Sequence, residues 1–403
     1  MAPGGQVWGK LPKGWLVGGV RGREGFFRVG RSDVGKWWLI DSAGVPFYAC
    51  CVHNGSWHQG ERLWSPAGLA LVRQWGFNSV GILKGAASPD CVPFFSVVDF
   101  CQGGLVLSAP GLRLPDVFDA TWPKLAETRA QEVCRPLTEN PALIGWVSDD
   151  NLAWAQDPGA GRPLLLQLCL SLEPGCAAYH AAWEFVLAPH GGRMDVLAKH
   201  WEVLLRNREV VRDMTRRELG IATRGYQKDN ARWTREFARR YFAVTSTAVR
   251  AADANHLLMG CRFGRVEGPE VMAKCVYPAV DIAMPDWREL PSFGDMQPIL
   301  AAEVCWNGEM FLQAPTGERG RRLTSVERML RRARAGLQRL ARHPAAVGYA
   351  WAQWQDGPGE QPPFARGLVH ANGSEAREHT ELLTVFNSRI ADFRRNSAAP
   401  ISL

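Results

Sequence analysis

The chain has 403 residues, 46% of them hydrophobic, which is enough to bury the core of one large barrel or of two to three ordinary domains. Its formal net charge of +7 is mild for this length, and the Arg-rich stretches are typical of solvated helix faces, so no nucleic-acid partner is expected. No run of 18 apolar residues and no apolar signal-peptide core are visible, so we expect no membrane span. The same observations predict a cytoplasmic protein, or a secreted one if the N-terminus is incomplete.

The N-terminal part of the chain predicts a small β structure. Residues 26–29 and 36–41 form two short apolar runs, and the sequence from Asp41 to Gly44 is a turn signal that leads into a third run. We therefore expect residues 1–45 to be an N-terminal segment that ends in a β-hairpin.

From residue 46 onward, strands and helices alternate. A strongly apolar strand at 45–52 is followed by a helix that starts at Ser65-Pro66 and closes at Gly76, and then by a strand at 78–83. This order predicts parallel strands joined by right-handed crossovers. Further strands are expected at 105–109, 142–147, 256–261, 279–284, 299–304 and 347–351, with helices at 121–133, 237–252 and 324–340.

This rhythm predicts an α/β fold, a (β/α)₈ TIM barrel over residues 46–390, followed by a C-terminal tail at 391–403. Residues 162–236 differ, because they carry helical periodicity, many Arg residues and few strand signals. We expect them to form a helical insertion at the barrel rim.

Glu303 is the leading candidate for a catalytic group. It lies near the C-terminal end of the apolar run 299–304, where an ionised side chain is costly to bury unless it is paired or used. In a barrel of parallel strands, that end faces the active site. The competing interpretation is a Glu exposed in a strand-to-helix loop.

Other polar and aromatic residues also gather directly after strands, which is what an active site at one end of a barrel requires. We expect contacts to sugar hydroxyls from the polar members and flat apolar platforms from some of the tryptophans. The alternatives are strand closure for His53 and Asn54, N-capping for Asp149 and Asp150, and core packing for the tryptophans. The set comprises His53, Asn54, Asp149, Asp150, Asn151, Trp154, Arg262, Asp286, Trp287, Glu303, Trp306, Trp351, Gln353 and Trp354.

Arg262 has three candidate roles: it orients Glu303, binds substrate or pairs with Asp286. The ten cysteines form no Cys-x-x-Cys pair, and several lie inside apolar runs, which is typical of buried thiols in a reducing compartment. No His/Asp/Glu spacing indicates a metal, and no glycine-rich phosphate motif indicates a nucleotide. We therefore expect no cofactor and no metal.

Several short segments, taken together and in order along the chain, form a fairly specific set. They read GKWWLID at 35–41, GVPF at 44–47, GFNSVG at 76–81, PDVFD at 115–119, NPALIGW at 140–146, DANHLLMGCRF at 253–263, GYAWAQWQD at 348–356 and GLV at 367–369. This set resembles the β-agarases of glycoside hydrolase family 50.

The resemblance implies a clan A (β/α)₈ barrel that cleaves β-glycosidic bonds with retention. It places the nucleophile after the seventh strand, at Glu303, and the acid/base after the fourth strand. Aligned on Leu152 and Trp154, the fourth-strand motif has Asn151 where the family has its catalytic Glu. The implied partner is a galactan-like or other β-linked oligosaccharide or polysaccharide, held by His53, Asn54, Trp154, Arg262, Trp287, Trp306, Trp351 and Gln353.

An amide cannot protonate a leaving group, whereas retaining hydrolysis uses two carboxyl groups about 5 Å apart. Three explanations compete. Asp150 or Asp149 takes over as the acid, because two adjacent carboxylates raise the pKa of one of them. Alternatively, the substrate carries a good leaving group, or the protein is a carbohydrate-binding barrel without catalysis.

Overall fold

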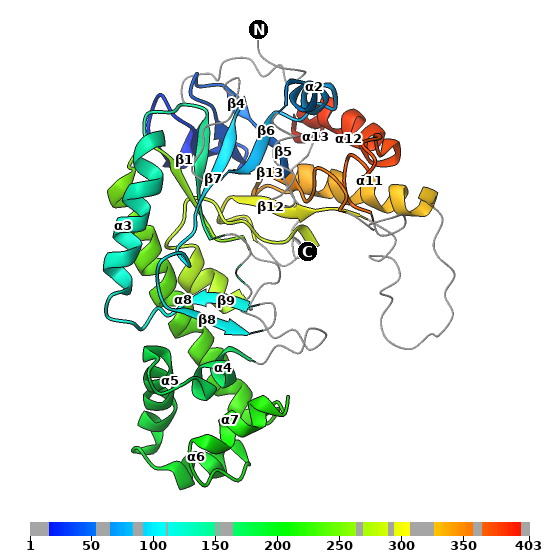
Figure 1. Ribbon diagram of the computed structural model, residues 1–403. Helices are drawn as coiled ribbons and strands as arrows, with labels where there is room; N and C mark the ends of the chain where they lie inside the picture. The colour runs from blue at the N-terminus through cyan, green and yellow to red at the C-terminus, as the bar shows by residue number, and fades with distance from the viewer. Residues whose placement is uncertain are drawn as a thin grey trace.

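The computed structural model describes residues 16–53, 65–83, 92–109, 112–149, 152, 164–262, 269–288, 294–306, 326–357 and 365–395. At its centre lies a curled sheet of seven strands, all parallel to their neighbours, in the order β11-β10-β7-β6-β5-β13-β12 (Figure 1). The strands are β5 (Ala49–His53), β6 (Ser79–Leu83), β7 (Phe94–Val98), β10 (Leu143–Ser148), β11 (Leu257–Gly260), β12 (Ile299–Val304) and β13 (Ala346–Trp351). The α/β class and most of the predicted strands are confirmed.

The predicted strand at 279–284 takes the form of isolated bridges rather than a ladder. Residues 281–286 lie between the two edge strands of the sheet, because they bond to the β11 side and to β12 at the same time. The amides of Asp281 and Ile282 donate to the Leu258 carbonyl, 2.7 and 3.2 Å away. The parallel bridges join Arg262 to Met284, Ala283 to Ile299 and Asp286 to Ala302.

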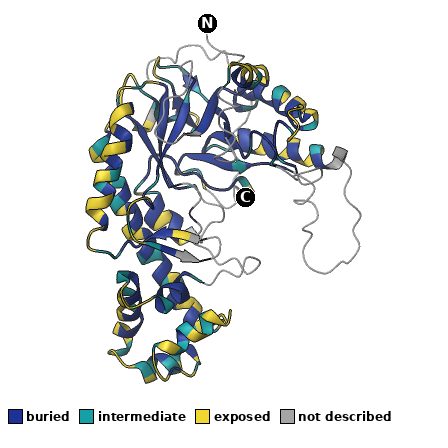
Figure 2. Cartoon of the chain, viewed as in Figure 1, coloured by how far each residue is buried: buried dark blue, intermediate teal, exposed yellow. Residues whose placement is uncertain are grey.

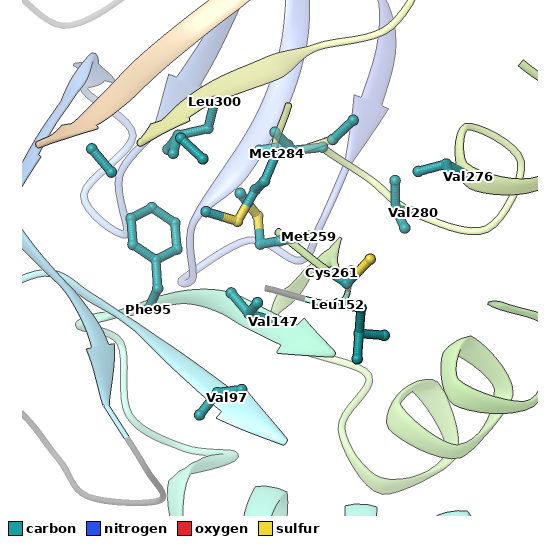
Figure 3. Close-up of a cluster of buried hydrophobic side chains, with 14 of the residues drawn as sticks. Phe95, Val97, Val147, Leu152, Met259, Cys261, Val276, Val280, Met284 and Leu300 are labelled. Atoms are coloured by element: carbon teal, nitrogen blue, oxygen red, sulfur yellow. The ribbon is translucent and has the colours of Figure 1, made fainter. Parts of the chain in front are cut away.

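The strands are apolar on both faces because both faces are covered. Every residue of β5, β7, β10 and β13 is buried, which is the pattern of parallel strands enclosed by helices. Side chains from β7, β10, β11 and β12 meet in one cluster that contains Phe95, Val147, Met259, Met284 and Leu300 (Figure 3). This cluster fixes where the strand ends, and the side chains beyond them, come together.

The helices flank the curled sheet to the left and right of this view, with exposed residues on their outer surfaces (Figure 2). The predicted start of α2 is confirmed, because the Ser65 hydroxyl accepts the Gly68 amide at 3.0 Å. The helices around the sheet are α2 (Pro66–Gln74), α3 (Trp122–Cys134), η2 (Arg135–Leu137), α8 (Arg224–Ala252), α9 (Pro269–Val271), η5 (Met272–Val276), α11 (Val326–Arg342), α12 (Arg377–Ser388) and α13 (Ile390–Arg395). Among the described residues, no helix is long and apolar enough to cross a membrane.

A separate antiparallel sheet precedes the parallel one. It has the order β1 (Leu16–Arg21), β2 (Arg28–Ser32), β3 (Trp37–Ile40) and β4 (Pro46–Phe47), so the predicted hairpin forms part of four strands. The sheet is tied to the end of the chain, because the Lys36 ammonium donates to the Arg394 carbonyl at 2.6 Å. The buried Arg394 guanidinium in turn donates to the Trp37 carbonyl.

The expectation that 105–109 is a barrel strand is wrong. Residues Val106–Ala109 form β8, which pairs antiparallel with β9 (Leu112–Pro115) in a two-stranded sheet. The third parallel strand is instead β7, Phe94–Val98, a continuous apolar run that is wholly buried. The flank of β8 is more exposed, since Leu105 keeps 54% of its surface accessible, so this hairpin has a solvent side.

The predicted helical insertion forms a lobe beyond the β8–β9 hairpin (Figure 1). It contains α4 (Leu165–Ser171), α5 (Ala177–Leu187), η4 (Ala188–His190), α6 (Met194–Trp201) and α7 (Glu209–Arg216). The expected boundary at residue 236 lies inside one continuous helix, because α8 runs unbroken through 29 residues from the lobe to the sheet.

Candidate active site

Glu303 stands out from the strand that carries it. Its neighbours Ala302 and Val304 are fully buried, whereas the Glu303 side chain keeps 23% of its surface accessible. Its carboxylate forms an ion pair with the Arg262 guanidinium, which follows β11 and is itself only 11% exposed. A carboxylate that is partly accessible at the end of a buried strand, and held by a cation, can act on a ligand at that position.

The backbone at Glu303 is also unusual. Four described residues other than glycine have positive φ, and two of them, Glu202 and Glu218, close or follow helices, where this conformation is normal. The other two are Asp149 at the end of β10 (φ 54°) and Glu303 in β12 (φ 55°). Such a backbone costs on the order of 1 kcal/mol in a residue with a Cβ, and it clusters at functional sites.

His53 is the last residue of β5, and it lies close enough to Arg262 to feel its positive charge. The side chain is buried, and neither ring nitrogen makes a hydrogen bond of normal geometry with another described residue. Burial, aided by the positive charge of Arg262, lowers the pKa of His53 to about 3. The ring is therefore neutral, and a ring nitrogen that the Gly81 backbone does not engage can exchange a hydrogen bond with a ligand hydroxyl or with water.

The ion pairs of Glu303 and Asp286 indicate which of its candidate roles Arg262 has. Its recorded carboxylate partner is Glu303, which fits the orienting role predicted from the sequence. Asp286, the other predicted partner, is almost fully buried and receives the Arg288 guanidinium, with Nε 2.9 Å from Oδ1. The partly accessible Glu303 carboxylate is thus paired with Arg262, and the buried Asp286 carboxylate with Arg288.

Asp149 follows β10, and its side chain is held by donors. Oδ1 accepts the backbone amides of Phe100 (2.8 Å) and Cys101 (3.2 Å), and Oδ2 accepts the Tyr241 hydroxyl at 2.6 Å. Burial raises the pKa of this carboxyl to about 7, although the Tyr241 hydrogen bond opposes the shift. These bonds tie the end of β10 to the loop after β7 and to α8, so they position the residues that follow Asp149.

The predicted tryptophans of the site are mostly enclosed. Trp306 and Trp351 are fully buried and meet edge to face, with ring centroids 4.5 Å apart. Trp354 is buried against Trp75. Trp287 lies against Gly336 of α11, where a Cβ would be 2.8 Å from its ring. Rings enclosed in this way support the packing around the central sheet rather than present a free face to a sugar.

Of the remaining predicted site residues, the structure describes Gln353 but not four others. Gln353 is half-buried and donates its side-chain amide to the Gln355 carbonyl at 2.8 Å. Asn54, Asp150, Asn151 and Trp154 lie outside the described residues. Tyr241 was not predicted as a site residue, because it belongs to an apolar helical stripe with Phe237 and its contact with Asp149 leaves no signal in the sequence.

No family model and no curated protein sequence matches the chain. Solved structures do match, among them three glycoside hydrolase-related structures with a TM-score of 0.64. PfGH50B has 15% identity, with 92% of this chain and 66% of that chain covered. An exo-β-agarase has 16% identity, with 97% and 69% covered. BpGH50 has 17% identity, with 96% and 87% covered.

The chain therefore spans about two thirds of the length of the first two structures and most of the third. At these identities the comparison establishes a shared fold. The likeness between the sequence segments and glycoside hydrolase family 50 thus has a counterpart in the fold of the whole chain.

Proposed function

We propose that the protein is a retaining glycoside hydrolase that acts on a β-linked, galactan-like oligosaccharide, with Glu303 as the nucleophile. We further propose that residues 281–286 act as the sixth strand of a (β/α)₈ barrel. This count makes β10 the fourth strand and β12 the seventh. The single observation that carries the proposal is Glu303 itself, which is partly accessible, paired with Arg262 and near the C-terminal end of β12.

In the proposed mechanism, a Glu303 oxygen attacks the anomeric carbon while the bond from that carbon to the leaving oxygen breaks. This step yields a glycosyl ester on Glu303, which water then hydrolyses with overall retention. Arg262 holds the carboxylate in its charged, attacking form through the ion pair. The neutral His53 ring offers a hydrogen bond to a sugar hydroxyl from the end of β5.

The leaving oxygen needs a proton, and the contacts of Asp149 argue against that residue as the donor. Both of its oxygens are engaged by buried donors, and the side chain is almost fully enclosed. A general acid must reach the oxygen that it protonates. We therefore propose Asp150 as the acid for natural substrates, with Asp149 as the positioning residue, and we expect aryl glycosides to react without help from an acid.

The test is trapping of the intermediate. A panel of 2-deoxy-2-fluoro aryl β-glycosides is incubated with the protein, and the digested peptides are analysed by mass spectrometry. We expect a sugar adduct on Glu303, and a loss of at least about a thousandfold in aryl glycoside turnover in Glu303→Gln. Glu127→Gln is the matched control, because Glu127 lies on α3 with 43% of its side chain accessible. Turnover that survives Glu303→Gln refutes the assignment.

The acid is tested separately, with natural β-linked oligosaccharides that include agar-derived ones. If Asp150 is the acid, Asp150→Asn abolishes their cleavage but spares activated aryl glycosides. If wild type cleaves only aryl glycosides and Asn151→Glu restores the natural substrates, the acid is missing from the chain.

The second candidate function is a carbohydrate-binding barrel without catalysis. Asn151 at the acid position, together with the engaged side chain of Asp149, favours it. This function predicts saturable binding of an oligosaccharide that is indifferent to Glu303→Gln, with no turnover of any aryl glycoside. Turnover that depends on Glu303 rejects it.

A further inference from the structure

A cluster of metal-ligating side chains lies in the helical lobe, away from the strand ends. It joins His190 at the end of η4, His200 in the last turn of α6 and Asp229 on α8. The potential ligand atoms of these three residues all lie within 4.8 Å of one another. The three residues lie on three separate elements, so no short sequence motif predicts the cluster.

One pair of these ligand atoms has the separation that a tetrahedral ion requires rather than that of a hydrogen bond. His200 Nε2 lies 3.5 Å from Asp229 Oδ2, beyond the usual 2.7–3.2 Å of a hydrogen bond between nitrogen and oxygen. Zinc bonds of about 2.0–2.1 Å place two tetrahedral ligand atoms about 3.4 Å apart. The His190 and His200 rings have centroids 5.1 Å apart and planes tilted by 43°, so they are neither stacked nor edge to face.

Asp229 is held by neighbours as a metal ligand usually is. Its side chain is 5% exposed, Oδ2 accepts the Trp201 indole N–H at 2.9 Å, and Oδ1 accepts Arg232 at 3.0 Å. A carboxylate has about four acceptor sites, so two hydrogen bonds leave capacity for a metal. Hydrogen bonds of this kind orient a ligand before the ion arrives. The Arg232 charge opposes a cation and is expected to moderate the affinity.

Gly225, in the first turn of α8, provides the room for His200. A Cβ at this position would lie 2.2 Å from the His200 carbonyl oxygen and 3.2 Å from His200 Nε2. Only glycine therefore permits α8 to approach the end of α6 so closely. This close approach brings the His200 ring of α6 toward Asp229, which lies about one turn after Gly225 on α8.

We propose that His190, His200 and Asp229 bind a divalent transition ion of the zinc class. Two imidazole nitrogens and one carboxylate favour zinc over calcium or magnesium, which take mostly oxygen ligands. The ion joins η4 and α6 to α8 and thereby stabilises the lobe on the helix that connects it to the sheet. This site is independent of the sugar chemistry proposed for Glu303.

The described residues contain one other group of potential ligands, formed by Asp99, Cys101 and Asp149. There Asp149 already accepts three hydrogen bonds, and the neighbouring Arg113 lies 3.5 Å from Asp99. This second group therefore has less capacity for an ion than the lobe cluster.

The experiment uses the full-length, tag-free protein after treatment with EDTA and dialysis. Zinc chloride is titrated by calorimetry, and the melting temperature is measured with and without one equivalent of zinc, magnesium or calcium. We expect one zinc equivalent to bind at micromolar concentrations and to raise Tm, because the ion binds the folded state. Magnesium and calcium are expected to leave Tm unchanged.

The variants distinguish this site from binding to surface groups or thiols. His190→Gln and His200→Gln keep polar side chains of similar size, and each is expected to weaken zinc binding at least tenfold. His180→Gln is the matched control in the same lobe, since the exposed His180 contacts the Pro174 carbonyl, and it is expected to bind as wild type does. Arg232→Ala is expected to tighten binding.

Two results would overturn the proposal. One is the absence of saturable zinc binding by the wild type at micromolar concentrations. The other is equal zinc affinity in wild type, in both glutamine variants and in the His180→Gln control. Circular dichroism confirms that each variant is folded, and a single variant that fails to fold leaves the other glutamine variant and Arg232→Ala to decide.

Discussion

Asp149 makes the stability of this protein depend on pH in a direction opposite to that of an ordinary surface carboxylate. Its pKa is about 7 in the folded protein, against a reference value of 3.8. Between these two values the folded chain keeps the proton while the unfolded chain releases it. The contribution of Asp149 to stability is therefore largest below about pH 4, falls as the pH rises, and levels off above about pH 7.

The size of the effect follows from the pKa difference. A difference of about three corresponds to on the order of 4 kcal/mol, because each pKa step is worth about 1.4 kcal/mol. Asn imitates the protonated acid at this position. Its oxygen can accept the Phe100 and Cys101 amides, and its amide can donate to Tyr241, whose hydroxyl lies 3.1 Å from the Ser148 carbonyl and can donate there.

We therefore expect the stability advantage of Asp149→Asn over wild type to grow from about 1 kcal/mol at pH 4.5 to about 4 kcal/mol at pH 7.5. The assay is urea unfolding followed by tryptophan fluorescence at a series of pH values, with linear extrapolation to water. Other carboxylates cancel in the difference between the two proteins. Asp213→Asn is the control, because Asp213 is exposed on α7, and its difference from wild type should not change with pH.

The reasoning is refuted if the difference between Asp149→Asn and wild type is the same at both pH values. Asp149→Ala checks the hydrogen bonds independently. It leaves the Phe100 and Cys101 amides without their acceptor, which costs about 1–3 kcal/mol for each buried amide at every pH.

Three further predictions test the site and its support. Arg262→Met is expected to lower kcat/KM for aryl β-glycosides by at least about tenfold with little change in KM, because Glu303 loses its cation. An unchanged kcat would contradict the orienting role of Arg262. Trp306→Ala is expected to cost about 3–5 kcal/mol in urea unfolding, since the fully buried ring would leave a cavity, whereas a loss below about 1 kcal/mol would mean that the ring is not core. Gly348→Ala is expected to destabilise the sheet by about 1–3 kcal/mol, because the new Cβ would lie 2.6 Å from the Ala49 carbonyl oxygen on β5. A variant as stable as wild type would show that the two strands can separate at this point.

The sequence by itself determined the class of fold and the position of the nucleophile candidate. Parallel strands enclosed by helices must be apolar on both faces, so runs such as 142–147 and 299–304 are visible without any structure. A carboxylate at the end of such a run conflicts with burial, and this conflict identified Glu303. The N-cap at Ser65 was equally predictable, because capping is a local interaction.

Only the tertiary structure decided which apolar runs belong to the central sheet and what each polar side chain contacts. The runs at 94–98 and 105–109 are similar in composition, and only strand pairing distinguishes β7 from β8. Residues 281–286 lack a ladder of their own and gain their place from both neighbours. The acid candidate Asp149 proved to be held by Tyr241, which is far along the chain on α8. Partners of this kind are brought together by packing, and local sequence carries no record of them.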